Sequence, residues 1–345
     1  MTNNLFDDTI NGIKRERPPV WFMRQAGRVL PEYLKLREKY SFRELMTEPE
    51  LTAEVTLQPV RSLGVDAAIL FSDILVIPEG LGMQLNFTDK GPVFDKPLKL
   101  MPDSVNDLKP NPSSLEHIYT AIDIIKKQKP AETALIGFCG APLTTFCYMV
   151  EGSSQKHDFA AAVKLLYTDR KKAEIILEKI TDLSVEYAVN QARHGIDAFQ
   201  LFDTHAGLIP SDLYFSVILP YVKKITDAVR RENVPVIFFP KGLGLGISKI
   251  NKDITDFVSV DWQYNISEAR KIIDPAVGLQ GNFDMRILSA DDRGIIDSEL
   301  EKFILFGRGN FNWIFNTGHG LNPDNKFENV KYLVEKIKSA DWMRS

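Results

Sequence analysis

Two arginines follow the first apolar run of the chain, at a spacing that suits a ligand with acid groups. The run VWFM (20–23) has the character of a buried strand, Arg24 follows it directly, and Arg28 comes four residues later. A planar guanidinium binds a carboxylate through two parallel hydrogen bonds, so this pair can hold more than one acid group. For two arginines alone, the alternative is an exposed pair on a helix without a ligand. The residues between them are Gln25, Ala26 and Gly27.

Four other polar residues come after later apolar runs, and with the arginines they indicate a particular kind of ligand. They are Asp73, Tyr148, Thr204 and His319. An aspartate that faces two arginines repels the acids that they bind, so it makes sense for a ligand that also carries N–H groups or develops positive charge. Each of the four alone has a structural alternative, namely a helix cap, a half-buried aromatic ring, a turn residue and a loop residue, in that order.

Eight short apolar or β-branched runs alternate with stretches of helical periodicity and predict the framework that would position these residues. The runs are 19–23, 66–71, 133–138, 197–202, 234–239, 256–262, 276–281 and 312–317. Most are almost continuously apolar, as in parallel strands covered on both faces. The longest helical stretch is 158–193. Strand then helix, eight times, predicts an α/β fold of the (β/α)8 barrel type more than a doubly wound sheet. The carboxyl ends of barrel strands meet at one mouth.

A local repeat supports this architecture. GVDAAILFSD (64–73) matches GIDAFQLFDT (195–204) and aligns Asp73 with Thr204 at two strand ends. Such an echo is expected where one strand-and-helix unit recurs along the chain.

One segment departs from the repeat. Residues 84–113, with the turn DKGP at 89–92, predict a small hairpin and a loop before a helix near 114–127. No low-complexity tract or charge block marks a second domain, so residues 1–345 are expected to form a single domain.

The composition limits the partners. The chain has 345 residues, of which 44% are hydrophobic and 26% charged, and its net charge is -4. This balance gives no overall attraction to nucleic acid or anionic membranes, so an anionic ligand has to be held by local arginines. No run approaches the about 18 apolar residues of a membrane span, and the first residues lack the apolar core of a signal peptide. Cys139 and Cys147 make no disulfide framework, no cluster has metal-ligand spacing, and a reducing cytoplasm is the expected setting.

Several motifs resemble the uroporphyrinogen decarboxylase family. PVWFMRQAGRVLPEY (19–33) is similar to its N-terminal signature and GFCGAPLTTFCYMVEG (137–152) to its second. The shorter stretches ILFSDIL, QLFDTHAG, QGNFD and FNTGHG follow in the family's order, and the similarity runs from about residue 4 to about residue 340.

This resemblance implies a (β/α)8 barrel, often a homodimer, that needs no cofactor or metal. It would remove carbon dioxide from the four acetate side chains of uroporphyrinogen III, to give coproporphyrinogen III in porphyrin and heme biosynthesis. Matched motif by motif, Arg24, Gln25 and Arg28 would bind propionate and acetate groups, with Arg24 and Arg28 also catalytic, and Ala26 and Gly27 would line the same turn. Asp73 would bind the pyrrole N–H groups and stabilise the transition state. The rest of the substrate site would be Tyr148, Thr204 and His319.

Elementary chemistry agrees with the role implied for Asp73. An acetate on a pyrrole cannot lose carbon dioxide unless the ring accepts the electrons. Protonation of a ring carbon turns the pyrrole into an iminium-like cation, which is such an acceptor. A carboxylate beside the N–H groups stabilises this cation as it forms, and catalysis requires such differential stabilisation.

Some positions depart from the family pattern. Thr204 stands where many members have Ser and keeps the hydroxyl. Lys35 replaces an Arg often found after the first motif, and this change is expected to weaken one carboxylate contact. Met285 stands where Pro is common, and the loop 320–330 lacks the usual Thr-Pro.

Two rival functions remain at this stage. Related barrels are zinc-dependent methyltransferases that act on corrinoid-bound methyl groups and need a His-x-Cys after a middle strand. Here that place reads FFPKGLGLG (238–246), with neither His nor Cys. Its glycine-rich part, KGLGLG (241–246), also lacks the spacing of a dinucleotide site and predicts a loop. The other rival is a tetrapyrrole-binding protein that has lost its chemistry. Such a loss would be expected at Asp73, which is present.

Overall fold

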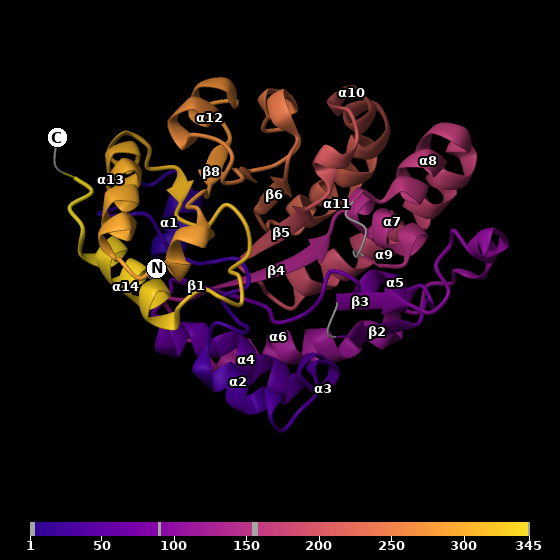
Figure 1. The fold of residues 1–345 in the computed structure, drawn as a ribbon, viewed down its shortest axis with the longest axis horizontal. Helices are drawn as coiled ribbons and strands as arrows, with labels where there is room; N and C mark the ends of the chain where they lie inside the picture. The colour runs from indigo at the N-terminus through magenta and orange to yellow at the C-terminus, as the bar shows by residue number, and fades with distance from the viewer. Residues whose placement is uncertain (1–3, 89–90, 154–157, 344–345) are drawn as a thin grey trace.

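The protein, described by a computed structural model over residues 4–88, 91–153 and 158–343, is built on one curled parallel sheet (Figure 1). Seven strands pair in the order in which they occur, each parallel to its neighbour. They are β1 (Ala67–Ile69), β4 (Ala134–Gly140), β5 (Ala198–Asp203), β6 (Val236–Pro240), β7 (Phe257–Ser259), β8 (Gly278–Gln280) and β9 (Trp313–Ile314).

The segment 19–23 closes the sheet into a ring of eight. Val20 forms a parallel bridge with Phe315, just beyond β9, and the Trp21 N–H donates to the Phe315 carbonyl at 3.3 Å. On its other side, the Val20 carbonyl accepts from the N–H of Asp66 at 2.8 Å, at the start of β1. The eight predicted runs and the (β/α)8 barrel are therefore confirmed.

The repeat seen in the sequence has a structural cause at the amino ends of the strands. An aspartate before a strand accepts a hydrogen bond from a backbone N–H at the start of the neighbouring strand. The pairs are Asp66 with Val20 (2.8 Å), Asp197 with Leu135 (2.6 Å) and Asp256 with Val236 (2.9 Å). Each carboxylate thus fixes the register between two strands, and the aspartate recurs with the strand.

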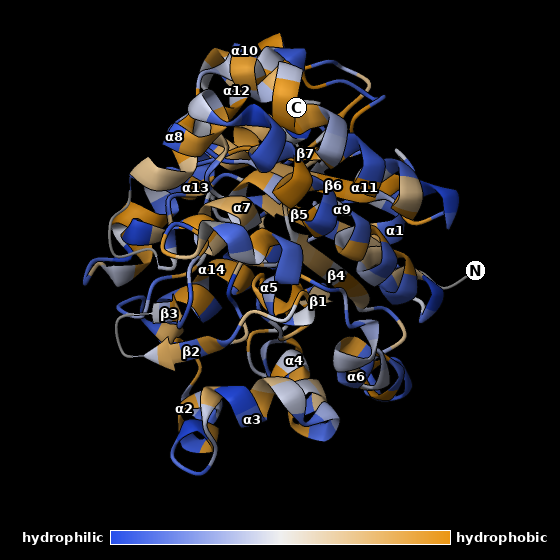
Figure 2. Ribbon diagram, turned by 90° about the vertical axis from the view of Figure 1, so that its right-hand side faces the viewer, coloured by the Kyte–Doolittle hydropathy of each residue, from blue (hydrophilic) through white to orange (hydrophobic). Residues whose placement is uncertain are grey.

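Helices cover the outside of the barrel, and the longer ones bury an apolar stripe, so hydrophobic residues concentrate toward the strands (Figure 2). In α11 (Leu219–Arg231), for example, Val222, Ile225 and Val229 are buried at helical spacing. The other α-helices are α1 (Leu5–Ile10), α2 (Pro31–Arg37), α3 (Phe42–Thr47), α4 (Pro49–Ser62), α5 (Val76–Gly80), α6 (Glu116–Gln128), α7 (Pro142–Glu151), α8 (Ala160–Thr168), α9 (Arg170–Arg193), α10 (Ser211–Leu213), α12 (Ile266–Ile272), α13 (Gly294–Gly309) and α14 (Phe327–Ser339). Across the described ranges, no helix has the length and apolar character needed to cross a membrane.

The predicted continuous helix over 158–193 is wrong, because the chain breaks between α8 and α9. Asp169 leaves the helical conformation with φ of -143°, and its side chain accepts a hydrogen bond from the N–H of Lys172 at 3.1 Å. The aspartate therefore caps the start of α9, in which Ile176 and Ile180 are buried at helical spacing.

An antiparallel hairpin lies within 84–113, formed by β2 (Leu85–Thr88) and β3 (Gly91–Phe94). The first half of the expected turn, residues 89–90, lies outside the described residues. Phe87 of β2 packs edge-on against Phe42 of α3, with ring centres 4.7 Å apart. This contact joins the hairpin to the helices that follow the first barrel segment.

Candidate active site

A cavity of about 830 Å³ opens at the carboxyl ends of the strands. This volume lies within the range of about 300–1,000 Å³ that is usual for small-molecule sites. Seven predicted residues line it, from the ends of four barrel segments: Arg24, Ala26, Gly27, Arg28, Asp73, Thr204 and His319. In the described part of the chain, no three His, Cys, Asp or Glu side chains group in a way that would hold a metal ion.

Arg24 and Arg28 are exposed cations that have no partner among the residues that the structure describes. Neither guanidinium makes a hydrogen bond or an ion pair with another described residue. Arg24 also has a φ of 62°, a left-handed conformation that costs energy in a residue with a Cβ. Its side chain lies against Gly320, where an added Cβ would come within 2.7 Å of the Arg24 Cγ. A strained, unpaired cation in a cavity is the arrangement expected where an anionic ligand supplies the missing partner.

Gln25 does not reach the cavity, although it lies between the two arginines. Its side-chain oxygen accepts from the N–H of Phe22 at 2.9 Å, and its side-chain nitrogen donates to the carbonyl of Ala67 at 2.9 Å. The amide therefore ties the first barrel segment to β1. Both ends of the Gln25 amide are used within the protein, and a direct contact between Gln25 and a carboxylate of the ligand stays a prediction from the family resemblance.

Tyr148 is likewise not brought to the cavity lining. It lies on α7, half-buried, and packs against the rings of Phe159 and His205 at 5.5 and 5.6 Å. Its contact with the end of β5 is therefore made through His205.

Asp73 lies at the end of β1 with one carboxylate oxygen available. Its Oδ1 accepts from the N–H of Leu75 at 2.8 Å, while Oδ2 has no hydrogen-bond donor among the described residues. Burial raises the pKa of Asp73 to about 6. The hydrogen bond from the Leu75 N–H lowers this pKa, the negative charge of Glu79 raises it further, and the positive charge of Arg24 lowers it. The hydrogen bond expected of a capping aspartate is thus present, but it involves only Oδ1 and leaves Oδ2 available.

His319 is an uncharged imidazole at neutral pH. Its ring stacks on Trp262, with centres 5.7 Å apart and planes 10° apart. Burial, followed by the positive charges of Arg24 and Lys241, lowers the pKa of His319 to about 3. The ring can exchange hydrogen bonds with a ligand without adding charge to the site.

Thr204 is held in place by a buried network under the end of β5. The preceding residue, Asp203, is fully buried and accepts from the hydroxyls of Thr144 at 2.6 Å and Tyr214 at 2.5 Å. Burial raises the pKa of Asp203 to about 6. Fixing Asp203 also fixes the backbone from which the Thr204 hydroxyl meets the cavity.

The cavity contains two arginines that the sequence analysis missed, Arg37 and Arg43. Arg37 comes one helical turn after Tyr33, which also lines the cavity, and this spacing was the available signal. Lys35, where a lost carboxylate contact was expected, is exposed on α2 and does not line the cavity. Arg37 therefore supplies a guanidinium to this wall.

Arg43 is paired within the protein, unlike Arg24 and Arg28. Its guanidinium binds Glu79 at 2.8 Å and the carbonyl of Leu85 at 2.6 Å, and it lies 5.6 Å from the ring centre of Phe87. These contacts join α3, α5 and the β2–β3 hairpin into one wall of the cavity.

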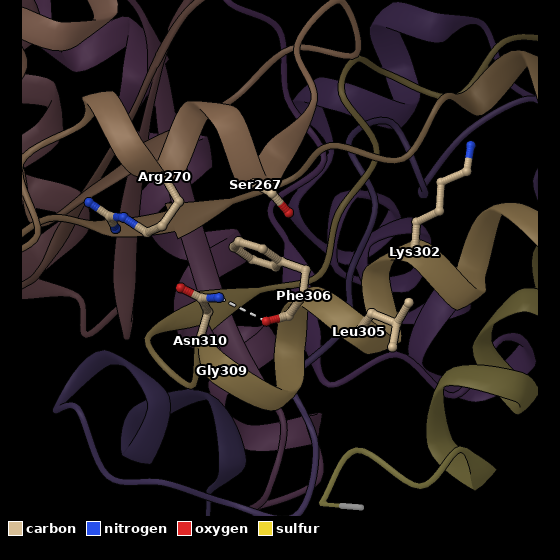
Figure 3. Close-up of a pocket in the computed structure, with 7 residues that line it drawn as sticks. All are labelled: Ser267, Arg270, Lys302, Leu305, Phe306, Gly309 and Asn310. Carbon is tan, nitrogen blue, oxygen red and sulfur yellow. Dashed lines mark hydrogen bonds between the residues drawn. The ribbon is translucent and has the colours of Figure 1, made fainter. Parts of the chain in front are cut away.

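A second hollow, of about 420 Å³, lies away from the mouth between α12 and α13 (Figure 3). It contains none of the predicted site residues. The Arg270 guanidinium there donates to the carbonyls of Val277 (2.7 Å), Ile273 (2.8 Å) and Asp274 (2.6 Å). Since this charge is used to close the end of α12, the hollow is no rival to the barrel mouth.

Comparison with known proteins identifies the family of the chain. Residues 1–340 match the family model described as Uroporphyrinogen decarboxylase (URO-D). A uroporphyrinogen decarboxylase of Geobacter metallireducens is 41% identical over 336 residues, which cover 97% of this chain and 98% of that protein. One from Geobacter sulfurreducens is 40% identical with the same coverage. Among solved structures, a methyltransferase from Methanosarcina mazei has a TM-score of 0.76 over 96% of both chains, but at 21% identity it shows the fold alone. The chain belongs to the uroporphyrinogen decarboxylase family.

Proposed function

We propose that the chain is a carboxy-lyase that removes the four acetate carboxyl groups of uroporphyrinogen III and produces coproporphyrinogen III in porphyrin and heme biosynthesis. Family membership over almost the whole chain supports the reaction class. The observation that carries the proposal is that one cavity contains two guanidinium groups without partners among the described residues and one carboxylate with a single hydrogen-bonded oxygen. A ring with acids at its edge and N–H groups at its centre matches both.

In the proposed reaction, Arg24 and Arg28 bind acid groups of the substrate and orient one acetate. Asp73 accepts hydrogen bonds from pyrrole N–H groups through the oxygen that Leu75 leaves available. Thr204 and the neutral His319 complete the contacts to the ring and its side chains. Gln25 acts as a positioning residue for the turn that contains Ala26 and Gly27, and a contact of Tyr148 with the substrate stays a prediction from the family resemblance.

The chemical step needs no electron source outside the substrate. A proton adds to a ring carbon next to the acetate and makes an iminium-like cation. The bond to the carboxylate then breaks, carbon dioxide leaves, and the electron pair of that bond neutralises the cation and forms an exocyclic methylene. A second proton adds to this methylene, and the ring carbon loses the proton that it gained, which leaves a methyl group. Each decarboxylation therefore consumes one proton net. Asp73 lowers the energy of the cation, because its negative charge is already in place when the positive charge develops.

The test is an anaerobic incubation of the purified protein with uroporphyrinogen III, without added metal or cofactor. After oxidation, chromatography separates the porphyrins by their carboxyl number. Products with seven, six, five and then four carboxyl groups are expected. Bound but unchanged substrate would indicate a binding protein instead, and absence of both would contradict the proposal and call for a zinc assay.

We further propose that the chain works in the cytoplasm as a homodimer of single-domain subunits, without nucleic-acid or membrane partners. The family resemblance supports the dimer, and the net charge of -4 supports the absence of polyanionic partners. Sedimentation equilibrium should give twice the chain mass of 39.1 kDa. A monomer mass, or two separate unfolding transitions of the chain, would contradict this part.

A further inference from the structure

Lys241 is a half-buried cation directly after the end of β6, and no described residue supplies a counter-ion for it. Its ammonium makes no hydrogen bond or ion pair within the described ranges. The backbone beneath it is fixed, since its N–H donates to the Asp203 carbonyl at 3.0 Å and its own carbonyl accepts from Gly207 at 3.0 Å. The ammonium therefore projects from a rigid strand end, as the guanidinium of Arg24 projects from another.

The position of β6 in the barrel places Lys241 across the mouth from the two arginines. From the segment 19–23, the ring runs through β1, β4 and β5 to β6, which is the fourth neighbour among eight and thus the opposite one. Phe239 of β6 (Val236–Pro240) lines the cavity, and Lys241 follows the end of this strand directly.

An aromatic ring connects the ammonium to a residue of the cavity lining. The Lys241 Nζ lies 5.4 Å from the ring centre of Trp262, and this ring stacks on His319, which lines the cavity. A ring face attracts a cation but accepts no conventional hydrogen bond from it, so the three N–H donors of the ammonium stay available for an acid.

Other cations of this region show that an aromatic contact alone does not replace a counter-ion. Arg286 lies over the same Trp262 ring, 5.6 Å from its centre, and Lys249 lies over the ring of Phe215. Both have carboxylate partners: Asp284 at 2.9 Å and Asp212 at 3.0 Å. Lys241 shares the Trp262 ring but has no carboxylate partner among the described residues. The missing anion is what a ligand would bring.

We propose that Lys241, held on the face of Trp262, is a carboxylate-binding residue that grips the tetrapyrrole on the side opposite to Arg24 and Arg28. This inference rests on the proposed function and adds a second acid-binding position to it. A macrocycle with acids on every side needs cations on more than one side of the mouth, because arginines at one edge leave the far acids desolvated and unpaired.

The test uses coproporphyrinogen III, which keeps its propionates and has no acetate left to lose, so its affinity is measured without turnover. Under anaerobic equilibrium dialysis, Lys241→Met should raise its Kd about tenfold, or about 1.4 kcal/mol. Lys241→Arg should restore most of the affinity, because it returns the charge. Lys249→Met is the matched control, since it removes an exposed lysine with an aromatic contact outside the cavity.

The outcomes separate this inference from the proposed function. An unchanged Kd in Lys241→Met, no recovery in Lys241→Arg, or an equal loss in Lys249→Met would overturn the role of Lys241. If the wild type binds the ring but never releases carbon dioxide from uroporphyrinogen III, the decarboxylase proposal fails while the Lys241 result stands. If the wild type does not bind the ring, both fail. An unfolding temperature of Lys241→Met equal to that of the wild type shows that the loss is not one of folding.

Discussion

Replacing Asp73 with Asn is the sharpest perturbation of the proposed site. The asparagine has almost the same shape, and its side-chain oxygen can still accept the hydrogen bond from Leu75. The substitution removes the negative charge and leaves Arg24 and Arg28 in place. Loss of one preorganised electrostatic group from a transition-state site costs about 10²–10³ in kcat, or about 2.7–4 kcal/mol. We expect this loss in kcat with a KM within about threefold of the wild type, because the acid-binding groups are untouched.

The same substitution should stabilise the free protein, with a pH dependence that follows from the pKa. Burial raises the pKa of Asp73 from 3.8 to about 6, so folding favours its protonated form. The stability that the protonated carboxyl gives to the folded state is fully present below pH 3.8 and is lost as the pH rises through 6. Above pH 6 the ionised carboxylate therefore costs the folded state about 3 kcal/mol, and at pH 5 about half of that. Asparagine has no such cost, so Asp73→Asn should exceed the wild type in free energy of unfolding, and by more at pH 8 than at pH 5.

Urea unfolding at both pH values and anaerobic turnover at pH 7 check the two halves of the argument. The wild-type kcat/KM should also fall below about pH 6, where Asp73 becomes protonated. A variant with turnover within threefold of the wild type would refute the catalytic role. A variant without a stability gain at pH 8 would refute the claim that the site holds its carboxylate at a cost.

Other predictions concern the residues around this carboxylate. Gly320→Ala should raise KM several-fold with unfolding energy within about 0.5 kcal/mol of the wild type, because the new Cβ displaces the Arg24 side chain; an unchanged KM would contradict it. Arg24→Gly and Arg24→Ala should both lose turnover, but the glycine variant should be more stable in urea by about 1 kcal/mol, since φ is 62° there; equal stabilities would show no strain. Arg43→Met should move the acid limb of the pH–rate profile to higher pH, because the charge of Glu79, no longer paired with Arg43, raises the pKa of Asp73 further. An unmoved limb would show that Glu79 does not affect the titration of Asp73.

The sequence was a good guide wherever local chemistry repeats with the barrel. Parallel strands buried on both faces leave continuous apolar runs, which is why all eight segments were visible without knowledge of their partners. The rule that strand ends meet at one mouth then connected Arg24, Asp73, Thr204 and His319, although almost 300 residues separate the first from the last.

Side-chain direction was not predictable in the same way. Gln25 sits in the same short turn as Arg24 and Arg28, but its amide points to the backbone of β1 while they face the cavity. The left-handed backbone at Arg24 causes part of this divergence, and no spacing rule shows it in advance. The break at Asp169 was missed because apolar residues recur on both sides of it.

The residues missed by sequence reasoning owe their roles to tertiary neighbours. Arg37 and Arg43 reach the cavity only because the segment after the first strand folds back against the β2–β3 hairpin. Lys241 belongs to the segment 241–246, which was predicted to be a loop and forms a turn followed by the start of a 3-10 helix (Gly244–Lys249). The lack of a carboxylate partner for Lys241 among the described residues becomes visible only in the structure.

The separation of charges within the mouth is an argument for the kind of ligand that fills it. Arg24 affects the pKa of Asp73, but less than burial does, and among the described residues the two form no ion pair. Had they paired, each would satisfy the other, and an acidic ligand with a polar N–H centre could engage neither without breaking the bridge. Kept apart, the exposed cations stay available for acid groups, and the buried carboxylate stays available for N–H groups at a cost in the free protein. A ligand that carries both acids and N–H groups can engage all of them and remove this cost, and its binding energy can then be used to hold a reacting acetate in position.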